Sequence, residues 1–287
     1  MSADWDNLII LDACRYDVFL EVMCNFDGIS GSMDYRITKA SRSKQFYQKN
    51  FDSMEFYDTI LITANANVEH ISDHFFKTVK TYGLEKRYNE SSASKYMGFW
   101  PDIVSEESIR QHKEHPDKKL VIHFMQPHAP FISETAIEEY EKIRDQHDVG
   151  VKRADLMFKS RPEFDDRLKT VSTHVESWYG LRREGYISQQ LLENLYAENI
   201  NLVLKYVRNI INLVDGKTII TSDHGEFLGE NGRFGHPPYF GGNEVRQVPW
   251  FTVENLSRRM VSFESPVGST KISTNIVNNN LKALGYK

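Results

Sequence analysis

The sequence predicts an α/β fold, a three-layer α/β/α sandwich in which helices cover both faces of a mostly parallel sheet. Two observations lead to this prediction. Short apolar runs recur along the chain and are continuous rather than alternating, as expected of strands that are buried on both faces. Segments with helical periodicity separate these runs, and strands that alternate with helices favour a parallel sheet. The chain has 287 residues, enough to bury one large core, and we expect a single domain over residues 1–287.

Five apolar runs account for the predicted strands. They lie at residues 8–11, 59–63, 120–124, 218–221 and 248–253. The clearest helix is predicted over residues 187–213, where apolar side chains recur at spacings of three to five residues. Gly216 follows it, near the position of a helix C-cap glycine.

The stretch at about 133–184 differs from the rest because it is highly charged and has few strand-like runs. We expect a helical insertion between two core strands, either a lid over the substrate or a solvated helical excursion. A lid would turn some of its arginines toward the site to meet an anionic substrate. The candidates are Arg153, Arg161, Arg182 and Arg183.

The composition argues against several classes of protein. There are 35 Lys and Arg against 40 Asp and Glu, a formal net charge of −5, which does not favour binding to nucleic acid. Cys14 and Cys24 show neither a disulfide framework nor metal-ligand spacing. No apolar run approaches the roughly 20 residues of a transmembrane helix, and the first residues do not resemble a signal peptide. We therefore expect a cytoplasmic protein, and the sequence does not indicate its oligomeric state.

Polar residues follow three of the predicted strands, at the edge of the sheet where open α/β folds bind ligands. Asp12 ends the first run, and His123 lies in the third, which leads into Gln-Pro-His-Ala-Pro-Phe at 126–131. Ser-Asp-His-Gly-Glu at 222–226 follows the fourth run, and a Gly-His pair comes later at 235–236. Aspartate and histidine together suit zinc, manganese or magnesium. An aspartate alone at such a position is more often a helix N-cap, but the combination predicts a metal site.

These segments together resemble the alkaline phosphatase superfamily in its sulfatase-like branch. Ser-Asp-His-Gly-Glu at 222–226 is similar to the second metal-ligand motif of that family. Pro-His-Ala-Pro-Phe at 127–131 is similar to the segment whose histidine contacts the substrate, and Gly-His at 235–236 to a later pair whose histidine reaches the same pocket. The match runs from about 7 to 253, with 133–184 unmatched. The resemblance implies the alkaline phosphatase-like fold.

It also implies a ligand set. Asp12, Asp223 and His224 would hold one divalent cation, with manganese or zinc expected and magnesium or calcium as alternatives. His128 and His236 would donate to the non-bridging oxygens of the substrate, or one of them would protonate the leaving group. His236 could instead ligate a second metal.

The nucleophile of this family lies a few tens of residues after the first aspartate, at the start of a helix. It is threonine, serine, or a cysteine converted to formylglycine, and neither cysteine here lies in the Cys-x-Pro-x-Arg sequence that the conversion needs. Ser43 falls in the expected window and would also ligate the metal, and Ser41 is the alternative. Arg15, Arg42 and Lys44 are predicted to bind the anionic oxygens of the substrate.

These residues predict a metal-dependent hydrolase or transferase acting on a phosphate ester or phosphodiester of a small molecule, a glycan or a lipid head group. Water as the acceptor makes it a hydrolase and an alcohol makes it a transferase, and the sequence does not choose between them. Two alternatives stay open. One is a sulfate-ester hydrolase that works without formylglycine, and the other is a catalytically inactive relative that binds an anion or a glycan.

Overall fold

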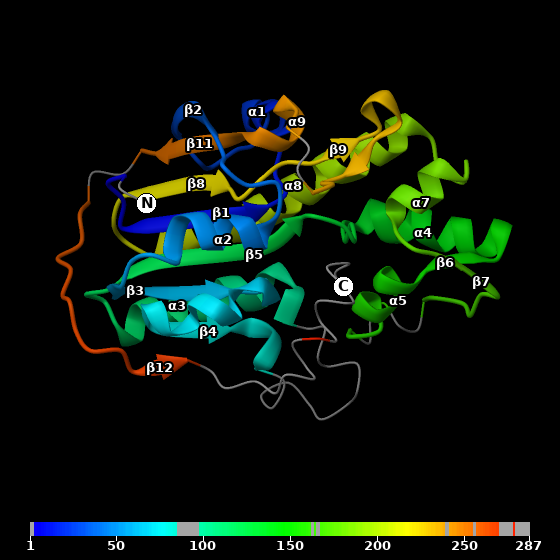
Figure 1. Ribbon diagram of the computed structural model, residues 1–287. Coiled ribbons are helices and arrows are strands. Elements are labelled where there is room, and N and C mark those ends of the chain that lie inside the picture. The colour runs from blue at the N-terminus through cyan, green and yellow to red at the C-terminus, as the bar shows by residue number, and fades with distance from the viewer. Residues whose placement is uncertain are drawn as a thin grey trace.

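The computed structural model describes residues 3–84, 98–161, 164, 167–238, 241–254, 257–269 and 278. Its centre is an eight-stranded sheet in the order β12-β4-β3-β5-β1-β8-β11-β2 (Figure 1). In chain order the strands are β1 (Asn7–Asp12), β2 (Gly31–Ile37), β3 (Phe56–Thr63), β4 (Phe75–Lys80), β5 (Lys119–Pro127), β8 (Thr218–Ser222), β11 (Gln247–Val253) and β12 (Gly268–Ser269).

The sheet is parallel except at β11. This strand runs antiparallel to both of its neighbours, β8 and β2, whereas the other neighbouring pairs are parallel. The parallel strands β3, β5, β1 and β8 therefore end at one edge, and their registers bring His123 level with Ile10 of β1 and Thr63 of β3.

Helices cover both faces of the sheet. One face carries α1 (Tyr16–Cys24), α3 (Pro101–Glu114) and α8 (Gln189–Leu213), and the other carries α2 (Ser43–Phe51) and the 3₁₀ helix η1 (Ala66–His74). The side chains of successive residues in a strand point alternately into the two helical layers. In β1, Ile9 and Leu11 pack into the first layer, and Leu8 and Ile10 pack into the second. This period of two on a sheet buried on both faces explains why the apolar runs are continuous.

The predicted fold class is confirmed. Each of the five predicted apolar runs lies in a strand, namely β1, β3, β5, β8 and β11. The helix predicted over 187–213 is α8, and the Ser188 hydroxyl caps it by accepting from the backbone N–H of Leu191 at 3.0 Å. Gly216 adopts a left-handed φ of 94° after the helix. Strands β2, β4 and β12 were not predicted.

The described part of 133–184 lies beyond the carboxyl ends of the central strands (Figure 1). Trp178 attaches it to the core, since its ring centroid lies 5.4 Å from those of both Phe131 and Tyr140. The view of this stretch as one insertion in a single domain stays a prediction. The elements are α4 (Glu134–His147), β6 (Val149–Val151), α5 (Lys152–Phe158), β7 (Thr173–Val175) and α7 (Trp178–Arg183).

In the described residues, four short elements lie around the site: β9 (Phe227–Leu228), the 3₁₀ helix η5 (Glu230–Gly232), β10 (Phe234–Gly235) and α9 (Asn243–Arg246). They form the segment between β8 and β11, and the β9–β10 pair carries the chain to His236. Within the described ranges, no helix has both the length and the apolar stretch that crossing a membrane requires.

Candidate metal centre

Three neighbouring strands bring acidic and imidazole side chains together. Asp12 is the last residue of β1, His123 lies in β5 on one side of it, and Asp223 directly follows β8 on the other. All three side chains are completely buried. One ligand atom from each of the three lies within 4.8 Å of the other two. Two carboxylates and an imidazole thus face one another out of contact with water.

His224 completes this cluster. Its Nε2 lies 3.3 Å from Asp223 Oδ2 and 3.9 Å from Asp12 Oδ1. In the described part of the chain, four buried atoms of the cluster have no hydrogen-bond partner: Asp12 Oδ1, His123 Nε2, Asp223 Oδ2 and His224 Nε2. Buried polar atoms are rarely left unpaired, because their desolvation then goes uncompensated. Four such atoms pointing into one space fit a divalent cation as their common partner.

The Nδ1 atom of each histidine in the cluster has a partner of its own. His224 Nδ1 lies 2.9 Å from the carbonyl oxygen of Gly225. Because a carbonyl can only accept, Nδ1 carries the proton and Nε2 presents its lone pair. His123 Nδ1 bonds the hydroxyl of Tyr47, which also lies 3.3 Å from Thr63 Oγ1. Burial raises the pKa of Tyr47 well above its usual value, so the phenol stays neutral.

Asp12 is held in place through its second oxygen. Asn65 Nδ2 donates to Asp12 Oδ2 at 2.6 Å, and the side-chain Oδ1 of Asn65 accepts from the backbone and side-chain N–H groups of Asn67, both at 2.9 Å. Burial by itself would raise the pKa of Asp12, but its contact with His123 and its electrostatic interaction with His128 outweigh burial and keep this pKa well below its usual range. The carboxylate is therefore ionised and ready to bind a cation.

Ser43 reaches the same carboxylate. It is the first residue of α2, it is completely buried, and its Oγ donates to Asp12 Oδ2 at 3.2 Å. The alternative, Ser41, has its hydroxyl 3.4 Å from Gln45 Oε1 instead. The structure thus brings Ser43 to the candidate ligands, in the place that the sequence analysis gave to the nucleophile.

His128 and His236 form a pair next to the cluster. Their Nε2 atoms lie 3.2 Å apart, and the His236 ring centroid lies 4.4 Å from that of His224. His128 Nδ1 lies 2.7 Å from the carbonyl oxygen of Ala129 and so carries a proton. Burial lowers the pKa of His128, and burial together with the nearby His224 and His128 imidazoles lowers that of His236 well below its usual value. Burial therefore disfavours the charged form of both imidazoles.

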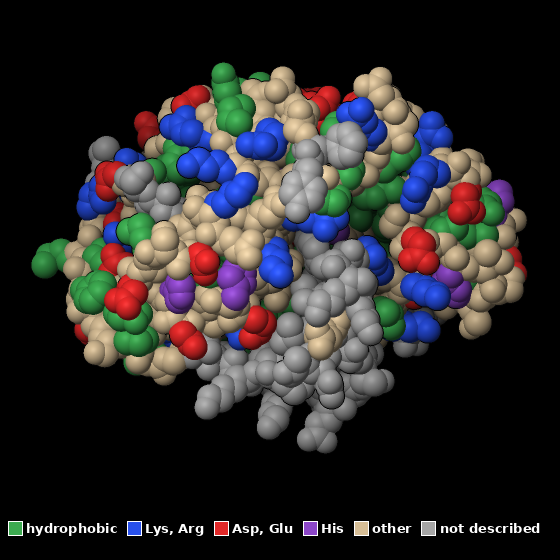
Figure 2. Space-filling model, viewed as in Figure 1, with side chains coloured by type: hydrophobic (Ala, Val, Ile, Leu, Met, Phe, Trp, Pro, Cys, Tyr) green, Lys and Arg blue, Asp and Glu red, His purple; other side chains and the backbone are tan. Residues whose placement is uncertain are grey.

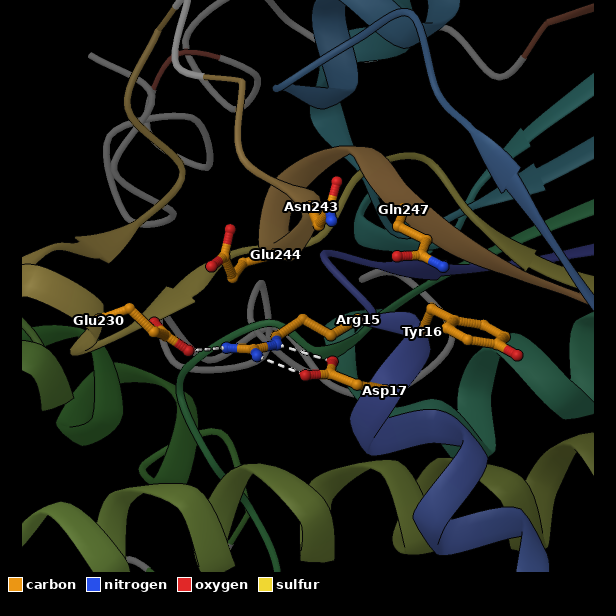
Figure 3. Close-up of a pocket in the computed structure, with 7 residues that line it drawn as sticks. All are labelled: Arg15, Tyr16, Asp17, Glu230, Asn243, Glu244 and Gln247. Atoms are coloured by element: carbon orange, nitrogen blue, oxygen red, sulfur yellow. Dashed lines mark hydrogen bonds and ion pairs between the residues drawn. The ribbon is translucent and has the colours of Figure 1, made fainter.

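Arg15 is placed differently from the expectation that it binds substrate. Its guanidinium is 2.6 Å from Asp17 Oδ2 and also pairs with Glu230 (Figure 3). These residues line a cavity of about 180 Å³ together with Tyr16 and Glu244, among others. Two carboxylates already neutralise Arg15, so we do not include it in the proposed substrate site.

Arg42 and Lys44 flank Ser43 in the chain. Arg42 is the N-cap residue of α2, and its charge contributes to the low pKa of His236. Lys44 is exposed on the first turn, as are Lys39 before it and Lys49 beyond it. Figure 2 shows that basic side chains gather over the part of this face where α2 and β2 lie. Their role in binding substrate stays a prediction.

The arginines of the predicted lid divide into two groups. Arg153 of α5 lies close enough to His128 for its charge to lower the pKa of that histidine. Arg161 instead pairs with Asp102 and lies over the ring of Trp100, 4.3 Å from its centroid. Arg182 donates from Nε to Gln189 at 3.2 Å.

Three residues of this centre were missed by the sequence analysis, which noted His123 without giving it a role. Asn65, Tyr47 and Thr63 hold the ligands in place, and His123 offers a ligand atom itself. A signal existed for Asn65, because it lies two residues beyond the second predicted strand, where polar residues reach the functional edge. Tyr47 lies on a helix and gave no such signal.

Comparisons with known proteins were made by sequence and by structure. No protein-family model matches the sequence, and no curated protein matches it. Among solved structures, the integral membrane protein lipooligosaccharide phosphoethanolamine transferase A from Neisseria meningitidis superposes with a TM-score of 0.50 at 10% identity. The match covers 88% of this chain and 48% of that one, so the chain spans about half the length of the transferase.

Two further structures match less closely. The soluble domain of the same Neisseria transferase has a TM-score of 0.48 at 14% identity, covering 85% of this chain and 75% of the domain. The C-terminal periplasmic domain of EcEptC from Escherichia coli, in complex with Zn, has a TM-score of 0.48 at 12% identity, covering 88% of this chain and 74% of the domain.

The expected cytoplasmic location is wrong. It rested on the lack of a signal peptide and of a membrane-spanning run in the sequence, neither of which fixes a compartment. The matched structure with the TM-score of 0.50 is that of an integral membrane protein, so the cytoplasmic expectation is withdrawn.

At this level of identity the likeness concerns the fold alone. The order of the polar motifs at the strand ends is consistent with that fold. The chain shares the α/β fold of the matched Neisseria transferase structure.

Proposed function

We propose that this chain is a metal-dependent enzyme that cleaves or transfers a phosphate ester, with Ser43 as the nucleophile. The observation that supports it most is the convergence of four unpaired buried ligand atoms on one space beside the Ser43 hydroxyl. Purely structural clusters of buried polar groups satisfy one another, and this one does not. Buried carboxylates with strongly perturbed pKa values are typical of functional sites.

The cation is proposed to bind to the three ligands expected from sequence, Asp12, Asp223 and His224. His123 is proposed as a fourth ligand. Two imidazoles and two carboxylates favour zinc or manganese over magnesium and calcium, which prefer oxygen ligands. A divalent cation bound there would supply positive charge that acidifies a neighbouring hydroxyl and neutralises the phosphoryl oxygens.

The residues of the chain then have separate tasks. The Ser43 hydroxyl passes its proton to an imidazole of the His128–His236 pair, and its Oγ forms a bond to phosphorus while the bond from phosphorus to the leaving oxygen breaks. Asn65 and the rest of the Asp12 network keep that carboxylate fixed beneath the hydroxyl. The His128–His236 pair lies beside the cluster. Once one of its imidazoles has taken up the Ser43 proton, it donates to a non-bridging oxygen or returns the proton to the leaving alcohol.

The phosphoserine is resolved when a second oxygen nucleophile attacks phosphorus and Ser43 Oγ leaves with a proton. Water at this step gives hydrolysis, and the hydroxyl of a sugar or lipid gives transfer. The matched Neisseria protein is named a phosphoethanolamine transferase, and the basic surface over α2 suits an anionic substrate. We therefore extend the proposal to a phosphodiester of a glycan or lipid head group.

The test is a steady-state assay with p-nitrophenyl phosphate, bis-p-nitrophenyl phosphate and p-nitrophenyl sulfate. We expect turnover of a phosphate ester that Ser43→Ala lowers by several powers of ten and that Ser41→Ala largely keeps. Thermal melts of both variants check their folding. Loss of activity in Ser41→Ala alone would move the nucleophile to Ser41, and full activity in both would mean that water attacks directly. Turnover of the sulfate alone, or of none of the three, would contradict the proposal.

A further inference from the structure

The hairpin of β9 and β10 brings His236 to the candidate centre, and its second strand is the less firmly packed of the two. His236 directly follows β10, and its Nε2 lies 3.2 Å from that of His128. Both residues of β9 are buried, whereas those of β10 are half-buried and the turn at 231–233 is exposed. The place of His236 therefore depends on the polar contacts that hold this turn.

Arg15 approaches the turn from a backbone that is tied to the proposed metal ligands. Its N–H donates to the Tyr196 hydroxyl at 2.9 Å, and that hydroxyl donates to the carbonyl oxygen of Ala13 at 2.7 Å. Ala13 directly follows Asp12, and its own N–H donates to Asp223 Oδ1 at 3.1 Å. The start of the Arg15 side chain is thus fixed relative to both carboxylates of the centre.

The guanidinium of Arg15 lies between one carboxylate on its own helix and another on the hairpin (Figure 3). Its Nε and Nη2 donate to the two oxygens of Asp17 at 3.0 and 2.6 Å, and its Nη1 bonds Glu230 Oε1. A two-pronged contact between arginine and a carboxylate fixes the plane of the guanidinium. Asp17 therefore orients Nη1 toward Glu230. Because only 8% of the Arg15 side chain is exposed, solvent screens these contacts little.

Glu230 passes this contact on to the hairpin. Its second oxygen, Oε2, accepts from the backbone N–H of Leu228 in β9 at 2.7 Å, and its carbonyl oxygen accepts from the N–H of Arg233 at 3.0 Å. Cavities of about 180 and 240 Å³ lie beside the ion pairs, and Arg15, Asp17 and Glu230 line both of them. The described side chains leave this space open, so the ion pairs connect α1 to the turn across it.

We propose that Arg15, through Glu230, is a positioning residue for His236: it holds the hairpin so that the His236 imidazole stays beside His128. The inference rests on the proposed function, because the place of His236 affects the rate only if its imidazole takes part in the reaction. It also gives a role to Arg15, whose charge is directed at the hairpin and not at the substrate.

The first test is Glu230→Gln. Glutamine has the same length but a single accepting oxygen, so it cannot serve both Arg15 and the N–H of Leu228. Small displacements of a group that acts on the substrate are costly, and kcat for the phosphate ester should fall by about ten- to a hundredfold. KM and the content of bound metal should change little, because the proposed ligands lie outside the hairpin. Glu21→Gln, at an exposed carboxylate on α1, is the matched control and should behave as wild type does.

The same change in a His236→Ala background separates positioning from general support of the fold. If Glu230 acts through His236, then Glu230→Gln lowers kcat in the wild-type chain but changes it by no more than about a factor of two in His236→Ala. A merely structural contact would lower kcat equally in both backgrounds. Thermal melts of all the variants check that they are folded.

The imidazole signals of His236 in NMR spectra test the placement without any use of activity. Glu230→Gln should shift or broaden them and leave those of His174, in β7, unchanged, whereas Glu21→Gln should change neither. If the wild-type chain turns over none of the three p-nitrophenyl esters, the proposed function fails, and these signals still decide whether Glu230 holds His236 in place. Unchanged His236 signals in Glu230→Gln, an unchanged kcat in an active chain, or equal falls in the two backgrounds would overturn the proposal.

Discussion

Asn65 shows how one neutral side chain prepares the candidate centre at the scale of single residues. Its amide donates to Asp12 Oδ2 at 2.6 Å and turns the other carboxylate oxygen toward the cluster. Partners of this kind fix the orientation of metal ligands, and their loss commonly costs about 10–100-fold in metal affinity. Asn65→Ala should therefore weaken zinc or manganese binding by about that factor, measured by competition with a chelating dye. Asn25→Ala, at an exposed amide on α1, is the control. Equal affinities in wild type and Asn65→Ala would show that Asp12 needs no such support.

Tyr47 offers a second test at this scale. Removing its hydroxyl in Tyr47→Phe leaves His123 Nδ1 buried without its partner. An orphaned buried group costs about 1–3 kcal/mol, so the free energy of unfolding in urea should fall by that amount. Tyr57→Phe, at a more exposed ring, should change it little. If the variant is as stable as wild type, the contact between Tyr47 and His123 does not help to hold the centre in place.

Single residues also show what the sequence could and could not predict about the site. Asp12, Asp223 and His224 follow apolar runs, and a polar residue directly after such a run can be recognised from the sequence alone. The contribution of His123 depends on its register between β1 and β3, which the sequence does not contain. Arg15 lies next to the centre in sequence, but its charge is taken by Glu230, a residue more than two hundred positions away.

At the scale of elements, the helices of the predicted insertion are joined by a buried ionic cluster. Asp155 of α5 accepts from Arg144 of α4 at 2.5 Å and from the Tyr140 hydroxyl at 2.7 Å, and it also contacts His174 at 2.9 Å. Removing one partner of a buried pair leaves the other charge uncompensated.

Asp155→Ala should therefore lower the free energy of unfolding by about 3–5 kcal/mol. Asp145→Ala removes the exposed Asp145–Lys169 pair on the same helix layer and should cost no more than about 1 kcal/mol. Urea denaturation measures both, and hydrogen exchange should show the loss of protection concentrated in α4 and α5. Similar costs in the two variants would contradict a buried role for Asp155.

Elements differed in how far the sequence predicted them. The run 8–11 is buried on both faces, so every residue is apolar and the strand is easily recognised in the sequence. Strand β2 lies at the end of the sheet with mostly exposed side chains, so its sequence has no apolar run. Strand β4 mixes phenylalanine with lysine, and Lys80 is buried only because it pairs with Glu69 at 2.7 Å.

At the scale of the whole molecule, the centre joins β1, β5 and β8 in the middle of the sheet, so a cation bound there would link distant parts of the chain. Ligand that binds only the folded state adds stability, about 2.7 kcal/mol at a concentration of 100 times its dissociation constant. Treatment with EDTA should lower the midpoint of thermal unfolding, and added zinc or manganese should restore it. Asp223→Asn should lose most of that response. A melting curve that neither EDTA nor metal changes would count against the centre.

The fold as a whole was predictable because continuous apolar runs and helical periodicity both express burial on two faces of one sheet. The location of the protein could not be predicted in the same way, because the packing of a core does not depend on the compartment.

The content of divalent metal in the purified chain tests the central claim most directly. Mass spectrometry of the protein, after removal of free ions, should find about one zinc or manganese ion per chain, and the double variant Asp12→Asn/Asp223→Asn should retain almost none. A chain that turns over a phosphate ester with no bound metal, or a double variant that binds metal as wild type does, would contradict the account.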